Sequence, residues 1–266
     1  YAHASVGTLH VRPVLNMKSD KDIKNMKSIS QEAFEMVKKY KGSHSGEHGD
    51  GIVRSEFHEM MFGKKITNAF EEIKDTFDSK NLLNPGKIVR PFKSNDRSLM
   101  RYKSGYQTEK INTHYDWSNW GQFSDAIEMC NNNGACRKLD SGVMCPSYRV
   151  TKEEKDLVRG RANTLRLALS NQLPEGSFVS KEMYETMELC VSCKACQREC
   201  PMSVDMAKMK SEFLSHYYQK FSMRIKDRII SNMPKLIWLY RIVNPIINKI
   251  KNYPLISNIV RKFGFA

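Results

Sequence analysis

The stretch CVSCKACQRECP, residues 190–201, decides how the second half of the chain is interpreted. Its four cysteines follow the pattern C-x2-C-x2-C-x3-C-P, which is the spacing of bacterial ferredoxins. The two-residue gaps allow Cys190, Cys193 and Cys196 to wrap one face of a cubane cluster. Zinc sites also use C-x2-C pairs, but a C-x2-C-x2-C triplet is unusual for zinc. The pattern therefore predicts an iron–sulfur cluster, with a structural zinc site as the alternative.

A second cysteine set lies upstream, in CNNNGACRKLDSGVMCP, residues 130–146. When the ferredoxin pattern is laid over it, Cys130, Cys136 and Cys145 occupy three of the four positions, and Asn133 occupies the remaining one. In two-cluster ferredoxins the fourth cysteine of each run binds the other cluster. This exchange predicts one complete [4Fe–4S] site formed by four thiolates, those of Cys145, Cys190, Cys193 and Cys196.

The exchange leaves Cys130, Cys136 and Cys200 with Asn133 as their fourth neighbour. An amide oxygen is hard and uncharged, so it is a poor ligand for iron. We therefore expect a second cluster that is either [3Fe–4S] or has a fourth ligand other than cysteine. The competing hypothesis is a single cluster bound by the run from Cys190 to Cys200, with the other thiols structural.

Composition limits the class of protein. The chain has 266 residues and seven cysteines, all between Cys130 and Cys200. An odd, clustered set argues against a secreted disulfide framework and favours metal binding in the cytoplasm. The net charge of +14 suits nucleic acid, an anionic membrane or acidic partners, or simply a solvated lysine-rich surface. We expect no nucleic-acid binding, because no such motif accompanies the charge. No apolar run reaches 18 residues, so we expect no transmembrane helix.

Pattern along the chain predicts an α+β protein with four segments. Residues 1–92 combine a strand over 7–16, a helix over 20–42, a tight glycine loop over 46–51 and a helix over 66–78. Residues 93–124 are polar and read as a linker. Residues 125–220 are expected to form a mainly α-helical, ferredoxin-like domain, with helices over 152–172 and 204–221. Residues 221–266 form a basic, apolar tail that we expect three prolines to break.

Three motifs of the first segment carry a resemblance: YAHASVGTLHVRP (1–13), SGEHGDGIVRSEF (45–57) and AFEEIKDTFDSKNLLNPGKIV (69–89). In this order they resemble the C-terminal cap domain of FAD-linked oxidases, flavoenzymes that oxidise D-lactate, glycolate and D-2-hydroxyglutarate. The motifs MCPSY and VDMAKMKSEFL, in the cysteine region, resemble the iron–sulfur domain fused to that flavin domain in large bacterial proteins. The resemblance implies a cap domain with an antiparallel sheet and helices.

The histidines of these motifs fit a metal site. His3 and His10 flank a glycine turn, and Glu47 and His48 lie in the glycine loop, where a ligand can approach the backbone closely. Two imidazoles and a carboxylate can bind a divalent ion such as zinc with open positions. The resemblance implies that His3, His10 and Glu47 bind the metal and that His48 removes the proton of the substrate hydroxyl. A single histidine is more often structural, and we expect His44 and His58 at the surface.

Other residues are candidates for the substrate and the flavin. Arg12 and Arg54 carry guanidinium groups that can pair with a substrate carboxylate. Related dehydrogenases have asparagine where this chain has Arg12, so the identity of the acid stays open. The resemblance implies that Asn84 lies near the flavin, although a helix-stop turn explains it equally well. No glycine-rich dinucleotide fingerprint occurs, and we expect the FAD-binding domain to precede Tyr1.

These features predict part of an FAD-dependent D-2-hydroxy acid dehydrogenase that passes electrons through iron–sulfur clusters to an external acceptor. The acceptor would be a quinone, a cytochrome or an electron-transfer protein. The alternative is a non-catalytic electron-transfer subunit. The basic tail, residues 221–266, would lie on the inner face of the cytoplasmic membrane or pack as a helical hairpin on a following domain.

Overall fold

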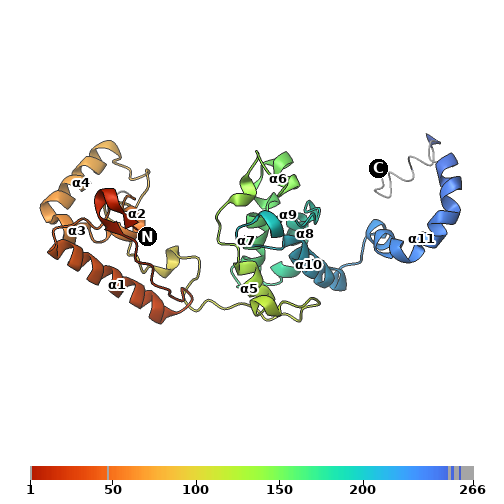
Figure 1. The fold of residues 1–266 in the computed structure, drawn as a ribbon, viewed down its shortest axis with the longest axis horizontal. Coiled ribbons are helices and arrows are strands. Elements are labelled where there is room, and N and C mark those ends of the chain that lie inside the picture. The colour runs from red at the N-terminus through yellow and green to blue at the C-terminus, as the bar shows by residue number, and fades with distance from the viewer. Residues whose placement is uncertain (1, 47, 251–252, 255–257, 259–266) are drawn as a thin grey trace. The chain divides into compact units, whose positions relative to one another are not determined.

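The computed structural model describes residues 2–46, 48–250, 253–254 and 258. The chain divides into two compact units, residues 1–107 and 108–266 (Figure 1). The first contains helices and a small antiparallel sheet, and the second is built from helices, so the predicted α+β class is confirmed. No helix among the described residues has the length and apolar character needed to cross a bilayer.

The first unit places its histidine motifs on a short hairpin and a loop between helices. Its elements are β1 (Ala2–His3), β2 (Thr8–Leu9), α1 (Asp20–Lys39), α2 (Gly51–Ser55), α3 (His58–Phe62) and α4 (Lys64–Phe77). The strands pair antiparallel, with Ala2 opposite Leu9 and His3 opposite Thr8. Gly7 closes the turn between them at φ +63°, a conformation that glycine adopts without strain. The hairpin thus brings His3 and His10 to the same end of the sheet.

The strand expected over 7–16 is wrong beyond Leu9. Only Thr8 and Leu9 pair with another strand, and the side chains of Val11 and Val14 are 81% and 98% exposed. A strand needs a partner for its backbone groups, and the described residues supply one partner of only two residues.

The two long helices of this unit form as expected. Ser19 caps α1 by accepting a hydrogen bond from the Asp22 N–H, and the Gly42 N–H donates to the Val37 carbonyl just past its end. Phe34 of α1 contacts Phe57 at a ring distance of 4.5 Å. Ile66, Ile73 and Phe77, on one face of α4, are nevertheless exposed.

The second unit is mainly α-helical, and α5, α8 and α10 pack around α7 (Figure 1). Its helices are α5 (Phe123–Glu128), α6 (Pro146–Thr151), α7 (Val158–Leu169), α8 (Lys181–Glu188), α9 (Ala195–Glu199), α10 (Met206–Lys220) and α11 (Ile225–Ile250). The core contains Trp117, which lies in the segment that the sequence predicts to be a linker. This unit therefore starts before residue 125.

Two helix predictions need correction. The helix expected over 152–172 begins only at Val158, because residues Glu154–Asp156 form a separate 3₁₀ turn. Gly160 permits this, since a Cβ there would lie 1.9 Å from the Glu154 carbonyl oxygen. The expectation that prolines break the tail is also wrong, because α11 continues through Pro234 and Pro245. Each proline costs one backbone hydrogen bond, which a helix can tolerate by bending.

A buried carboxylate joins residues 114–117 to α10. Glu212 is 0% exposed and accepts hydrogen bonds from the His114 and Tyr115 N–H groups and from Trp117 Nε1, at 2.8, 3.0 and 2.9 Å. Burial opposes its ionisation, but these hydrogen bonds outweigh that effect and lower the pKa of Glu212. The carboxylate is therefore stabilised in its charged form.

Replacing Glu212 with Gln should destabilise the second unit by roughly 2–4 kcal/mol. The glutamine side chain is uncharged, and its NH2 group would face the N–H donors that now bind the carboxylate. Urea unfolding measures this loss. In the native chain the contribution of Glu212 is present at neutral pH and is lost as the pH falls through the ordinary glutamate pKa, about 4.3, toward the lowered one. Glu185→Gln, at an exposed position of α8, is the matched control. Equal stability of the two variants would contradict this role.

Candidate functional site

Four cysteines from two distant segments line one cavity in the second unit. They are Cys145, which precedes α6, and Cys190, Cys193 and Cys196 of the ferredoxin-like run. Cys200 is not among the lining residues. Ser192 and Lys194, between these cysteines, have φ of +53° and +60°, so the backbone curls around the cavity. The grouping is the one that ligand exchange between two cysteine runs requires.

Positive charge surrounds this cavity. The Val158 N–H, at the first residue of α7, donates to Cys145 Sγ at 3.3 Å, and backbone N–H groups of Met206 and Ala207, at the start of α10, donate to Cys196. Helix N-termini favour anions. Arg161, only 1% exposed, also lines the cavity. These groups suit thiolates and an anionic cluster.

A carboxylate holds the two cysteine segments together. Glu199, at the end of α9, accepts hydrogen bonds from the Val143 and Met144 N–H groups at 2.9 and 3.1 Å. These amides directly precede Cys145. The contact attaches the Cys145 loop to the helix that contains Cys196.

The thiol geometry favours a cluster over a single zinc ion. Tetrahedral zinc with bonds of about 2.3 Å holds its sulfurs about 3.8 Å apart. Among the described residues, which include all seven cysteines, no three thiols lie within 4.8 Å of one another. A cluster places a cube of iron and sulfide between its ligands and spaces them more widely. Burial raises the pKa of Cys145 to about 12 and also raises that of Cys196, so binding of the metal must displace protons.

The remaining cysteines are less completely assembled. Cys130 and Cys136 are both buried, and burial, with a smaller contribution from the nearby Cys130 thiol, raises the pKa of Cys136. Asn133 is exposed, and its side-chain oxygen accepts a hydrogen bond from the Ala135 N–H at 2.8 Å. Asn133 therefore stabilises the loop, and it is not oriented as an iron ligand.

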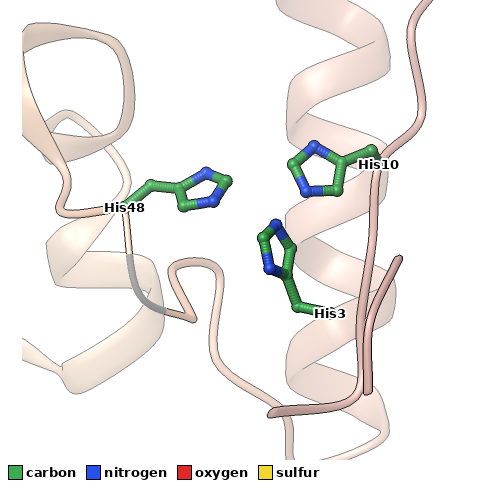
Figure 2. A group of neighbouring side chains, drawn as sticks. All are labelled: His3, His10 and His48. Atoms are coloured by element: carbon green, nitrogen blue, oxygen red, sulfur yellow. The ribbon is translucent and has the colours of Figure 1, made fainter. Parts of the chain in front are cut away.

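Three histidines of the first unit converge from the hairpin and the glycine loop. The ring centroids of His3 and His10 are 4.7 Å apart, and that of His48 lies 5.1 and 5.2 Å from them (Figure 2). One ring nitrogen of each lies within 4.8 Å of the others. Partial burial, with the nearby His3, His48 and Arg12, lowers the pKa of His10, which favours the neutral, metal-binding form. The residues fit a divalent ion. Glu47, the predicted fourth group, lies outside the described residues.

The other candidate residues, Arg12, Arg54 and Asn84, lie in three different segments of the first unit. Arg12 is exposed on the segment after β2. Arg54 Nη1 donates to the Gly49 carbonyl at 3.1 Å, so its guanidinium braces the loop that carries His48. Asn84 has φ +49° in the turn after α4, where its side chain accepts a hydrogen bond from Lys87 Nζ at 3.2 Å.

The expectation that His44 and His58 are surface residues is wrong. Their exposed fractions are 7% and 3%, because the aromatic side chains Phe34, Phe62 and Phe70 enclose them. No local sequence signal indicated this burial, because the three phenylalanines come from three different helices, α1, α3 and α4. Arg161 was also missed, since it looks like an ordinary polar position of a helix.

Two known family models match the chain. Residues 1–88 match the model described as FAD linked oxidases, C-terminal domain, and residues 126–204 match the 4Fe-4S dicluster domain. The chain joins an FAD-linked oxidase C-terminal domain to a 4Fe-4S dicluster domain. The three converging histidines lie in the FAD-linked oxidase domain, and all seven cysteines lie in the dicluster domain.

Curated relatives carry both domains in one stretch. The chain is 32% identical to a D-2-hydroxyglutarate dehydrogenase of Haemophilus influenzae over 88% of its own length, and 28% identical to one of Escherichia coli over 98%. The FAD-linked oxidase domain alone is similar to a D-lactate dehydrogenase of Archaeoglobus fulgidus, 36% identical over 34% of this chain and 19% of that protein. The chain spans 26% and 29% of the length of the first two relatives. No solved structure matches it.

Replacing Cys145 with Ser should remove about four irons per chain, because Cys145 completes the cavity formed with Cys190, Cys193 and Cys196. Cys200→Ser is the matched variant, and it should keep the reduced [4Fe–4S] signal in electron paramagnetic resonance. Iron and acid-labile sulfide, measured after anaerobic purification, give the count. Loss of that signal in Cys200→Ser with retention in Cys145→Ser would support the single-cluster alternative instead.

Proposed function

We propose that this chain is the substrate-binding and electron-exit part of an FAD-dependent D-2-hydroxy acid dehydrogenase. The convergence of His3, His10 and His48 carries the proposal, because it places two metal-binding imidazoles beside a third that can act as a base. The names of the relatives support a hydroxy acid as substrate. The acid itself is left open, because Arg12 departs from the pattern of related dehydrogenases.

Each candidate residue has a separate role in the proposed reaction. His3 and His10, with Glu47, would hold a divalent ion such as zinc, and such an ion would supply Lewis-acid chemistry at the substrate hydroxyl and carboxylate. His48, exposed on its loop, would take the hydroxyl proton, and FAD, when bound, would supply the acceptor for the carbon-bound hydrogen as hydride. Arg12 and Arg54 are the candidates to pair with the substrate carboxylate, and Asn84 is the candidate to contact the flavin.

The flavin-binding domain would pack on the apolar surface that the first unit exposes. Val11, Val14 and the α4 face of Ile66, Ile73 and Phe77 are exposed in the described residues. Exposed apolar patches of this kind mark contact surfaces. We assign these exposed side chains to contact with the flavin-binding domain.

Electrons leave one at a time through the dicluster domain. Bound iron–sulfur clusters accept single electrons, whereas hydride delivers two, and the flavin converts between them. Cys145, Cys190, Cys193 and Cys196 hold one [4Fe–4S] cluster in the ferredoxin manner. Cys130, Cys136 and Cys200 hold a second, either [3Fe–4S] or with a ligand other than cysteine. The alternative, an electron-transfer subunit without catalysis, would need no converging histidines.

We assign contact with the electron acceptor's membrane to the tail, residues 221–266. α11 exposes Ile230, Met233 and Ile237 at helical spacing, and residues 221–266 carry nine Lys or Arg and one acidic residue. An apolar face with basic flanks suits the anionic inner face of the cytoplasmic membrane, where a quinone would accept the electrons.

Replacing His48 with Gln in the full-length protein should slow substrate-driven bleaching of the flavin by at least about 100-fold, the usual contribution of a general base. Stopped-flow absorbance under anaerobic conditions measures the rate. The iron content should not change, because His48 lies in the other unit. Bleaching at the native rate would end the assignment of His48 and favour the non-catalytic alternative.

Vesicle binding tests the tail. The chain should sediment with vesicles containing phosphatidylglycerol but not with neutral vesicles, and Ile230→Glu with Ile237→Glu should reduce binding at least about fivefold. Ser231→Glu with Asn232→Glu, which adds the same two negative charges on the other side of α11, is the matched control. Equal sedimentation with neutral and anionic vesicles, or no effect of the double variant, would contradict membrane contact.

A further inference from the structure

A second group of metal-binding side chains lies in the first unit, apart from His3, His10 and His48. It consists of His44, which precedes the glycine loop, Asp50, near the end of that loop, and His58, the first residue of α3. One nitrogen or oxygen of each lies within 4.8 Å of the others. His44 Nε2 is 3.5 Å from Asp50 Oδ1, and His58 Nε2 is 2.9 Å from Asp50 Oδ2. The two groups share no residue.

His58 is oriented as a ligand. Its Nδ1 donates to the Ile88 carbonyl at 3.1 Å, which leaves Nε2 as the atom directed toward Asp50. Ile88 is itself held, because its N–H donates to the Oγ of buried Ser55 at 3.1 Å. A hydrogen bond from the second ring nitrogen to a backbone carbonyl is the usual support of a metal-binding histidine.

His44 supplies the decisive observation. Its side chain is fully buried, yet neither ring nitrogen makes a hydrogen bond, and Asp50 Oδ1 beside it has none either. Buried polar atoms without partners are costly, so three such atoms in one place indicate a missing ligand. The rings of Phe34 and Phe62 lie 5.4 and 5.6 Å from the His44 ring and wall the site with apolar surface.

We propose that His44, Asp50 and His58 bind a divalent metal ion of the zinc class. Two imidazoles and one carboxylate are a donor set that zinc accepts, with a water in the fourth position. With bonds of about 2.0–2.1 Å, a tetrahedral ion separates its ligand atoms by about 3.3–3.4 Å. The measured separations of 2.9 and 3.5 Å lie on either side of this value.

The position of this ion defines its role. His44 and Asp50 lie on either side of His48 in the sequence, and His58 is the first residue of α3, the second helix after the loop. The ion would therefore attach both ends of the loop to α3 and so position His48. Its aromatic surroundings suit a structural site that exchanges metal slowly.

Zinc binding to the whole chain, purified anaerobically with its iron, tests the proposal. His3→Ala with His10→Ala removes the other histidine group. In this background we expect one zinc per chain after equilibrium dialysis, measured by mass spectrometry of the metals. Zinc-edge X-ray absorption should show nitrogen and oxygen ligands at about 2.0–2.1 Å and no sulfur at about 2.3 Å.

Two variants in the same background decide the ligands. His44→Asn should weaken zinc binding at least tenfold, and so should Asp50→Asn, which keeps the size of the side chain and guards against a folding defect. His114→Asn, at an exposed position of the second unit, is the matched control and should change nothing. The proposal is overturned if the background binds no zinc, or if neither variant weakens binding, which would leave a purely hydrogen-bonded histidine–aspartate–histidine group.

Discussion

The second unit depends on keeping four sulfur atoms around one cavity in a protein interior. Thiolates repel one another and are costly to bury, so the surrounding structure must supply positive charge. It does so with the first turns of α7 and α10 and with the buried guanidinium of Arg161. Glu199 then fixes the Cys145 loop against α9. The N-termini of α7 and α10 therefore meet at the cysteines.

The first unit brings its histidines together with few structural elements. A two-residue hairpin and one glycine loop bring three imidazoles together, and the loop is braced by Arg54 on one side and by the aromatic core on the other. His44, Asp50 and His58 use that core to hold the ends of the loop. The group of His3, His10 and His48 and the group of His44, Asp50 and His58 therefore share a loop but no side chain.

The spacing of residues in the sequence indicated the candidate sites better than it indicated the secondary structure. The cysteine pattern and the order of the histidine motifs indicated both sites, because ligand spacing and glycine loops leave local signals. Long helices such as α1 and α10 were also predicted from their caps and periodicity. The strand over 7–16 was wrong, since strand formation depends on a partner far away in the sequence. Burial of His44 and His58, and the role of Arg161, depend on packing between segments that no local pattern records.

The account depends on iron at the thiols, and X-ray absorption at the iron and zinc edges tests this most directly. For anaerobically purified chain we expect iron bound by sulfur, with a second scattering shell from neighbouring iron atoms. Only a cluster produces that metal–metal shell. Zinc in place of iron at the cysteines, with four sulfurs at about 2.3 Å and no metal neighbour, would contradict the account.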